Sequence, residues 1–148
     1  MSLTLQDIDN AEHAVKRVRV ELQAIGRELH KMRTGRELGP EYGFDSYSRQ
    51  NYCGSNYVGQ EGPDWGEGTP IFSLCYYWSR AEDTAYVTIP LGWLEQDWRA
   101  LEQARLDEER RTETERKRVA AAQAARDREA ADRAEFERLK AKFEEPRP

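Results

Sequence analysis

The sequence predicts an α+β fold: a helix, a small antiparallel β-sheet and a second, long helix, in that order along the chain. Three observations predict it. Residues 1–34 carry a regular heptad pattern of apolar side chains, residues 35–92 are rich in glycine and aromatic residues, and residues 93–148 are highly charged and contain no glycine. We therefore expect an N-terminal amphipathic, coiled-coil-like helix, a β unit and a long C-terminal helix within these boundaries.

The N-terminal helix has a clear start. Thr4 and Asp7 have the spacing of a capping box, in which the hydroxyl accepts a hydrogen bond from a first-turn amide and the carboxylate favours the positive end of the helix. Apolar residues then recur in steps of three and four residues over nearly four heptads. This heptad seam consists of Ile8, Ala11, Val15, Val18, Leu22, Ile25, Leu29 and Met32.

The heptad seam predicts that the helix associates with a second copy of itself, most simply as a homodimer. The residues expected to form this interface are Ile8, Val15, Val18, Leu22, Ile25 and Leu29. The alternative is that the seam covers the chain's own β unit or its second helix. The flanking residues are less decisive: Glu28 and Arg33 could pair across a parallel dimer, whereas Asp7 and Glu12 would repel each other there. Gly26 costs about 1 kcal/mol relative to alanine in a helix interior.

The β unit contains a predicted hairpin. Strand 71–79 alternates Phe72, Leu74, Tyr76 and Trp78 onto one face, and strand 84–90 does the same with Ala85, Val87 and Ile89. Residues 80–83 form a loop of hairpin length. Because an isolated hairpin is marginally stable in water, we expect one or two short strands from residues 44–58 to complete the sheet.

The C-terminal helix is expected to begin near Leu94, with Leu91, Leu94, Trp98 and Leu101 forming a buried face over its first turns. Beyond residue 106 the apolar face ends, and eleven of the fourteen residues from 105 to 118 are charged. Local pairs keep such a segment helical. Acid-first pairs at i,i+4, each contributing about 0.2–0.5 kcal/mol, are Asp107–Arg111, Glu113–Lys117 and Glu129–Arg133.

Composition disfavours two classes of function. The net charge is −5, and the basic residues Arg110, Arg111, Arg116, Lys117 and Arg118 are interspersed with acids, so nucleic-acid binding through this helix is disfavoured. No apolar stretch approaches the roughly 20 residues of a membrane span, and the N-terminus lacks a basic start followed by an apolar run. We expect a soluble, cytoplasmic protein that does not bind membranes.

Signatures of catalysis are missing from the sequence. It contains no nucleophile elbow, zinc-protease motif, phosphate-binding loop or dinucleotide fingerprint. His13 and His30 fall at outward positions of the helix, and Cys53 and Cys75 form no CxxC pair, which favours two free thiols. We therefore expect no catalytic residues, no metal site and no cofactor.

The favoured function is that of a non-enzymatic, oligomeric binding protein that recognises a partner protein or small ligand through its aromatic β region. Tyrosine and tryptophan bury a large area at low entropic cost, and an arginine can direct an anionic group. The predicted contact residues are Tyr42, Tyr47, Arg49, Tyr52, Tyr57, Trp65 and Arg80.

A phage or mobile-element accessory protein that inhibits or sequesters a host or defence component would be one instance. The main alternative is a structural or assembly protein that uses the long helix as a spacer or assembly arm.

Overall fold

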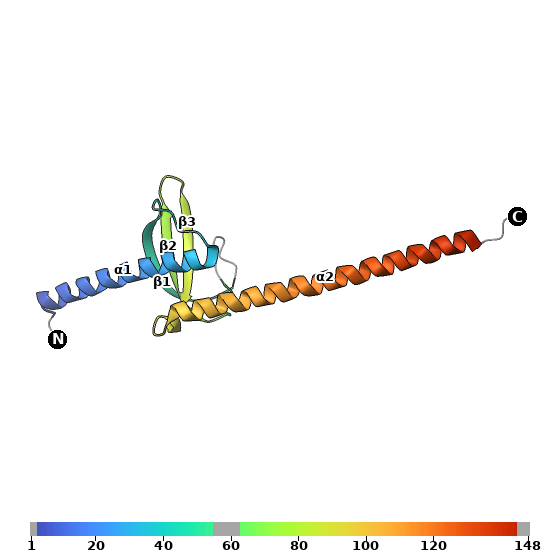
Figure 1. Ribbon diagram of the computed structural model, residues 1–148. Helices are drawn as coiled ribbons and strands as arrows, with labels where there is room; N and C mark the ends of the chain where they lie inside the picture. The colour runs from blue at the N-terminus through green and yellow to red at the C-terminus, as the bar shows by residue number, and fades with distance from the viewer. Residues whose placement is uncertain (1–2, 55–62, 145–148) are drawn as a thin grey trace. The chain divides into compact units, whose positions relative to one another are not determined.

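A computed structural model of the chain describes residues 3–54 and 63–144. Its elements, in order, are α1 (Leu5–Thr34), β1 (Gly43–Asn51), β2 (Pro70–Trp78), β3 (Asp83–Pro90), the 3-10 helix η1 (Leu91–Trp93) and α2 (Trp98–Glu144) (Figure 1). The predicted α+β fold is therefore confirmed, with an N-terminal helix, a small antiparallel sheet and a long C-terminal helix. The chain divides into two compact units, Met1–Gln103 and Ala104–Pro148, which are described separately.

The described sheet has the order β1-β2-β3, with both neighbouring pairs antiparallel. The predicted hairpin is formed by β2 and β3, where Leu74 lies opposite Val87 and Tyr76 opposite Ala85. The third strand, β1, falls in the region expected to complete the sheet. Its register with β2 shifts between Phe44 and Ser46, so Asp45 forms a bulge.

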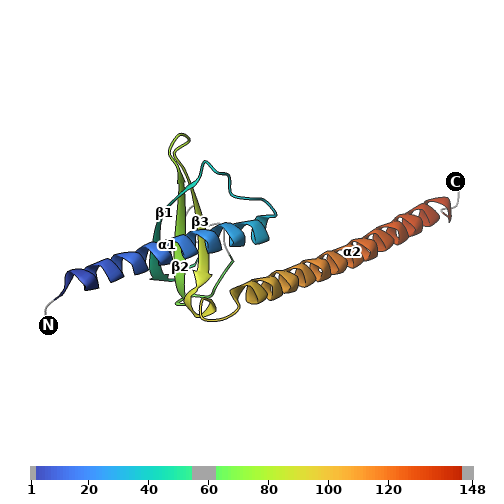
Figure 2. The ribbon, with the colours of Figure 1, turned by 60° about the vertical axis from the view of Figure 1, so that its left-hand side comes forward.

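The core of the first unit lies between α1 and one face of the sheet. In both ribbon views α1 crosses the strands, and the second half of the helix covers them (Figures 1 and 2). The buried residues that form this core are Leu22, Leu29, Leu38, Leu74, Tyr76, Val87, Ile89 and Trp98. The faces predicted for the hairpin are those that pack here, because alternate strand residues point to the same side of a sheet.

A glycine allows α1 to approach the sheet closely. Gly26 is buried in α1, and a Cβ atom at this position would overlap the hydroxyl oxygen of Tyr76 on β2. That hydroxyl donates a hydrogen bond to the carbonyl of Gln23 at 2.7 Å. Glycine at position 26 lowers the helix propensity of α1, but it permits a close helix–sheet contact that a side chain would block.

Both ends of α1 are capped by local contacts. The backbone N–H of Asp7 donates to Thr4 Oγ1 at 3.2 Å, and the Asp7 carboxylate accepts from the Thr4 N–H at 2.9 Å, which confirms the predicted capping box. The Thr4 hydroxyl also donates to the Asp7 carboxylate at 2.6 Å, and this bond, together with that from the Thr4 N–H, holds the pKa of Asp7 below its ordinary value. At the other end Gly35 has φ +72°, and its N–H donates to the Lys31 carbonyl at 2.8 Å.

The second helix begins later than the sequence pattern predicted. Residues 91–93 form η1, and α2 starts at Trp98 rather than near Leu94. The reason is local. The carboxylate of Asp97 accepts a hydrogen bond from the Ala100 N–H at 3.2 Å, as an N-cap residue does, so the first α-helical turn follows Asp97.

In the second unit, α2 is stabilised by ion pairs within the helix. Every residue from 108 to 144 is exposed. Two predicted pairs form, Lys117–Glu113 at 3.3 Å and Arg133–Glu129 at 3.6 Å. Of the third predicted pair, Asp107 lies 3.1 Å from Arg110, and Arg111 lies 3.8 Å from Glu108. None of the described helices has the length and apolar character that crossing a membrane requires.

Candidate functional site

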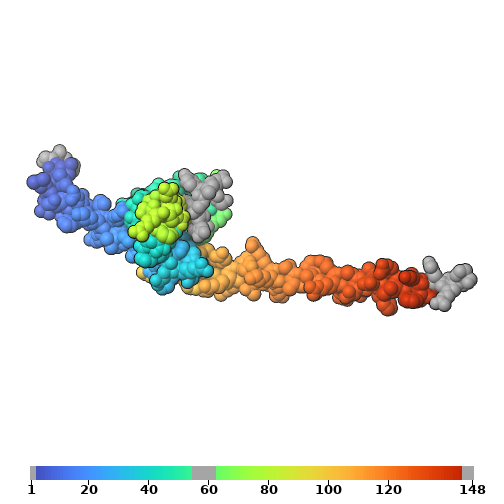
Figure 3. All heavy atoms as spheres, turned by 90° about the horizontal axis from the view of Figure 1, so that it is seen from above, coloured from blue at the N-terminus to red at the C-terminus, as the bar shows by residue number. Residues whose placement is uncertain are grey.

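The structure divides the heptad seam of α1 into two halves. Leu22 and Leu29 are 4% and 0% exposed and, with Ile25, pack against the chain's own sheet. These three residues were predicted to form a dimer interface, but in the structure they cover the chain's own sheet, as the alternative prediction proposed. In contrast, Val15 and Val18 are 58% and 42% exposed, and Figure 3 shows the N-terminal part of α1 standing clear of the sheet. The exposed half of the seam, here called the open half, consists of Ile8, Ala11, Val15 and Val18.

The open half carries a shallow apolar groove. Its volume is about 390 Å³, and Leu3, Ile8, Ala11 and Val15 supply its apolar lining. Leu3 and Ile8 are 82% and 44% exposed. A contiguous exposed apolar surface of this kind is a common mark of an interaction site.

The two charged residues that could have paired across a parallel dimer pair instead within the chain. Glu28 accepts two hydrogen bonds from Arg99 at the start of α2, at 2.6 and 2.7 Å. Arg33 pairs with Glu102 of the same helix at 2.9 Å. Both contacts lie within the first unit. They remove the electrostatic support that the sequence offered for a parallel dimer.

Three of the predicted aromatic contact residues are engaged inside the protein. The Tyr42 hydroxyl donates a hydrogen bond to Asp83, and this bond raises the pKa of the phenol. Tyr52 is buried, with 8% of its surface exposed. The indole N–H of Trp65 donates to Thr88 Oγ1 at 2.9 Å, and its ring packs edge-on against Trp93 at 5.0 Å. Contacts within the protein therefore explain the positions of Tyr42, Tyr52 and Trp65 without a partner.

The other predicted contact residues are more exposed but do not form one cluster. Tyr47 and Arg49 of β1 both lie beside Phe72, with centroid distances of 6.0 Å from the Tyr47 ring and 5.9 Å from the Arg49 guanidinium. Arg80 is exposed in the turn between β2 and β3. Tyr57 lies outside the described residues. The structure thus brings Tyr47 and Arg49 together and leaves Arg80 apart from them in the fold.

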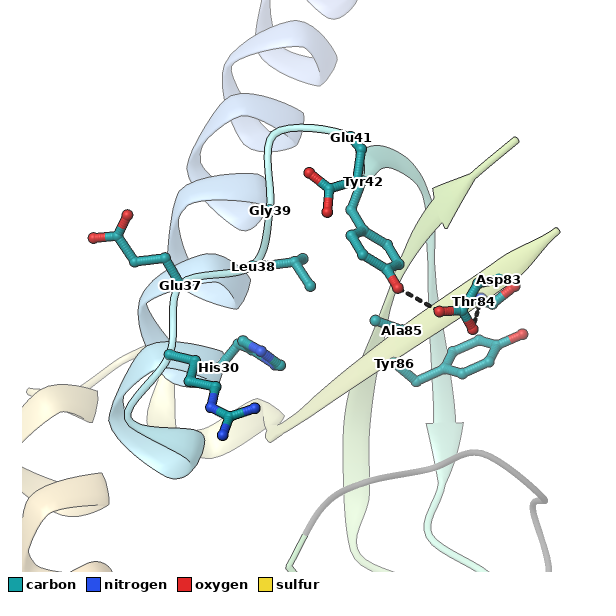
Figure 4. Close-up of a pocket in the computed structure, with 11 residues that line it drawn as sticks. His30, Glu37, Leu38, Gly39, Glu41, Tyr42, Asp83, Thr84, Ala85 and Tyr86 are labelled. Atoms are coloured by element: carbon teal, nitrogen blue, oxygen red, sulfur yellow. Dashed lines mark hydrogen bonds between the residues drawn. The ribbon is translucent and has the colours of Figure 1, made fainter. Parts of the chain in front are cut away.

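A polar cavity lies beside the first half of β3 and is here called the β3-edge hollow. It has a volume of about 480 Å³ and is bounded by residues of the 36–42 loop on one side and by residues 83–86 on the other (Figure 4). His30 of α1 lines it as well, so the sequence expectation of an outward histidine does not describe its surroundings. Among the predicted contact residues, Tyr42 lines this hollow.

One arginine fixes the loop that forms the outer wall of the hollow. Arg27 Nη1 donates to the carbonyl of Leu38 at 2.9 Å, Arg27 Nη2 donates to the carbonyl of Tyr42, and the guanidinium lies over the Tyr76 ring at 5.4 Å. A second contact, Lys31–Glu37 at 2.7 Å, joins the same loop to α1. The wall is therefore held in place by α1 rather than left to move freely.

Sequence reasoning did not find Glu41 and Tyr86, which line the hollow, or Arg27, which holds its loop. Arg27 follows the buried Gly26 in α1, and this position was the local signal that could have pointed to it. The position of Tyr86 at the hollow depends on β3 being an edge strand, which strand alternation cannot reveal.

No group of three or more His, Cys, Asp or Glu side chains in the described part of the chain is placed to hold a metal ion. Cys53 and Cys75 are free thiols. Burial raises the pKa of Cys75, which favours the unreactive thiol over the nucleophilic thiolate.

Comparison of the chain with protein-family models, with curated proteins and with solved structures finds no match. Function is therefore inferred from the contacts within the chain itself.

Proposed function

We propose that this protein is a non-enzymatic binding protein that forms a homodimer through the open half of the α1 seam and recognises a partner beside its aromatic β region. The observation that carries the proposal is the division of one continuous seam. Its second half is buried on the sheet, while Val15 and Val18 of the open half are 58% and 42% exposed. Burying such side chains is favourable, at roughly 25 cal/mol per Å² of apolar surface.

The position of the sheet favours an antiparallel dimer. From Leu22 onward the sheet occupies the seam, so a second helix running parallel and in register would meet it. Antiparallel pairing centred on His13 would place Ile8 opposite Val18 of the partner subunit and Ala11 opposite Val15 of the partner subunit. Both sheets would then lie outside the helix pair, as a two-fold interface allows.

Light scattering over a range of protein concentrations tests the dimer. The seam is short for an interface of the standard roughly 1,600 Å², so we expect the mass to rise with concentration. Val15→Glu should hold the protein at the monomer mass. Val20→Glu is the matched control, because Val20 lies in the same helix and is 66% exposed but outside the seam. Identical masses for the wild type and both variants at every concentration would refute the dimer.

The β3-edge hollow supports partner recognition. Its volume of about 480 Å³ falls within the roughly 300–1,000 Å³ common for ligand sites, and it combines carboxylates, hydroxyls and a guanidinium. The exposed pair of Tyr47 and Arg49 offers a second surface on the opposite edge strand, β1. Arg36→Ala at the hollow and Arg49→Ala at β1 separate the two surfaces in a binding assay, because neither side chain is in the described core.

The second candidate function is that of a structural protein in which α2 serves as a spacer or assembly arm. It is favoured by the exposure of every residue from 108 to 144 and by the ion pairs that stabilise the helix locally. Deleting whole heptads from this stretch would impair assembly under this hypothesis, while the dimer and the hollow would remain intact. Two basic side chains near residue 115 lie in ion pairs, Lys117 with Glu113 at 3.3 Å and Arg118 with Glu115 at 2.8 Å, which argues against a phosphate-binding role.

A further inference from the structure

The outer edge of β3 has a defined set of backbone groups. Within the described sheet β3 pairs with β2 alone, so its other side is an edge. Arg33 Nη1 donates to the carbonyl of Thr88 at 2.9 Å, which identifies Thr88 as a residue whose backbone groups point away from β2. Because these groups alternate along an antiparallel strand, those of Thr84 and Tyr86 point the same way.

Some of these outward groups are already bonded and others are not. The Thr88 carbonyl is taken by Arg33, and the Thr84 N–H donates to the Asp83 carboxylate at 2.9 Å. Within the part of the chain that the structure describes, the Thr84 carbonyl and the N–H and carbonyl of Tyr86 have no such partner. One carbonyl, one N–H and a second carbonyl in sequence are the groups that an added strand would bond.

The β3-edge hollow lies against these same residues, 83–86. Figure 4 shows the strand on one side of the hollow and the 36–42 loop on the other, with the Tyr42 hydroxyl bonded to Asp83. Because Arg27 and Lys31 fix the loop, the space beside the strand is preformed. A preformed site avoids part of the ordering cost of binding.

The charge of the hollow selects among extended ligands. Three carboxylates line it, those of Glu37, Glu41 and Asp83, against one guanidinium, that of Arg36. Glu37 is already paired with Lys31, which leaves Glu41 and Asp83 as the carboxylates nearest to a ligand on the strand. A lysine or arginine side chain is the complement of this pair.

We propose that the β3 edge binds an extended peptide segment of a partner protein as an added strand, bonded to Thr84 and Tyr86, with a basic side chain directed at Glu41 and Asp83. The inference rests on the proposed function, since it names the partner class for the same hollow. Main-chain hydrogen bonds supply affinity in this mode, and the side-chain pocket supplies specificity.

Two short synthetic peptides test the proposal with the full-length protein. Both are acetylated and amidated, one alternating threonine and lysine, the other threonine and glutamate. Tyr86→Pro removes the outward N–H and is compatible with an edge strand whose N–H faces outward, while Tyr86→Ala is the matched control that keeps the N–H. We expect the lysine peptide to bind Tyr86→Pro roughly 10-fold more weakly than Tyr86→Ala. The glutamate peptide should bind neither variant.

Amide hydrogen exchange in the wild-type protein provides a test that does not depend on the proline variant folding. The lysine peptide should slow exchange at the Tyr86 N–H roughly 10-fold and leave Arg80 in the turn unchanged. Unchanged exchange at Tyr86, equal binding of the two variants, or equal binding of the two peptides would overturn the proposal. So would loss of self-association in Tyr86→Pro, because the edge would then join two copies of the chain. Light scattering on the same samples shows separately whether the α1 dimer stands.

Discussion

Arg33 at the end of α1 and Glu102 near the start of α2 form a buried, two-point ion pair. Arg33 Nε lies 2.9 Å from Glu102 Oε1, and Arg33 Nη2 lies 3.2 Å from Oε2. The Glu102 side chain is 0% exposed and that of Arg33 10%. The same guanidinium donates to the Thr88 carbonyl and lies over the Trp65 ring at 5.4 Å. One arginine therefore joins α1, β3, α2 and the segment before β2.

Glu102→Ala is expected to lower the free energy of unfolding by about 3–5 kcal/mol, because it leaves the Arg33 charge buried without its partner. Glu28→Ala is the matched control. It removes an ion pair between the same two helices, Glu28–Arg99, whose side chains are 40% and 59% exposed. Exposed pairs contribute little, so this loss should be much smaller. Urea unfolding followed by tryptophan fluorescence compares them, and equal losses would mean that burial does not decide the strength of the pair.

Gly26→Ala is expected to destabilise the protein, although alanine favours a helix by about 1 kcal/mol. The new Cβ would overlap the Tyr76 hydroxyl, and overpacking of this kind typically costs about 1–3 kcal/mol. A double-mutant cycle with Tyr76→Phe isolates the cause. In the phenylalanine background the cost of Gly26→Ala should fall by about 1 kcal/mol, because the overlapping oxygen is gone. An unchanged cost would place the strain elsewhere.

The fold could be predicted because its elements are encoded by local patterns. Phe72, Leu74 and Tyr76 recur at every second position of β2, and the capping box at Thr4 and Asp7 marks the start of α1. The period of the heptad seam, in contrast, indicates that its side chains need an apolar partner. It does not indicate whether that partner is the chain's own sheet or a second copy of the helix. Val15 and Leu22 occupy equivalent seam positions, yet only Leu22 lies over the sheet.

The candidate site was harder to predict, because aromatic residues bind partners and fill cores with the same chemistry. Tyr42, Tyr52 and Trp65 fit no strand period, which suggested contact residues. They are instead held by a hydrogen bond to Asp83, by burial and by a hydrogen bond to Thr88. The β3-edge hollow depends on which strand ends the sheet, and that is a property of the whole fold.

Stability is expected to fall steeply in alkali because of Tyr76. Burial raises the pKa of its phenol from the ordinary value of 10.0 to about 12, an effect partly opposed by the nearby Arg27 charge. The protonated phenol therefore stabilises the fold fully below about pH 10, and this contribution is lost as the pH rises towards 12. The loss amounts to about 3 kcal/mol. Unfolding by urea at successive pH values should show a much shallower decline in Tyr76→Phe, and parallel curves would contradict this assignment.

A chain that ends at Arg111 is expected to keep the fold of the first unit. The core residues all lie between Leu22 and Trp98, and every residue from 108 to 144 is exposed, so the described part of the deleted stretch adds no residue to the core. The near-ultraviolet circular dichroism of the tryptophans should match that of the full chain, and thermal unfolding should remain cooperative with a similar midpoint. Deletion from Trp98 onward is the contrasting variant, because it also removes Glu102 and a core tryptophan. If the shorter truncation already loses the tryptophan signal, α2 must be packed along residues that the structure leaves exposed, and the division into two units would not hold in solution.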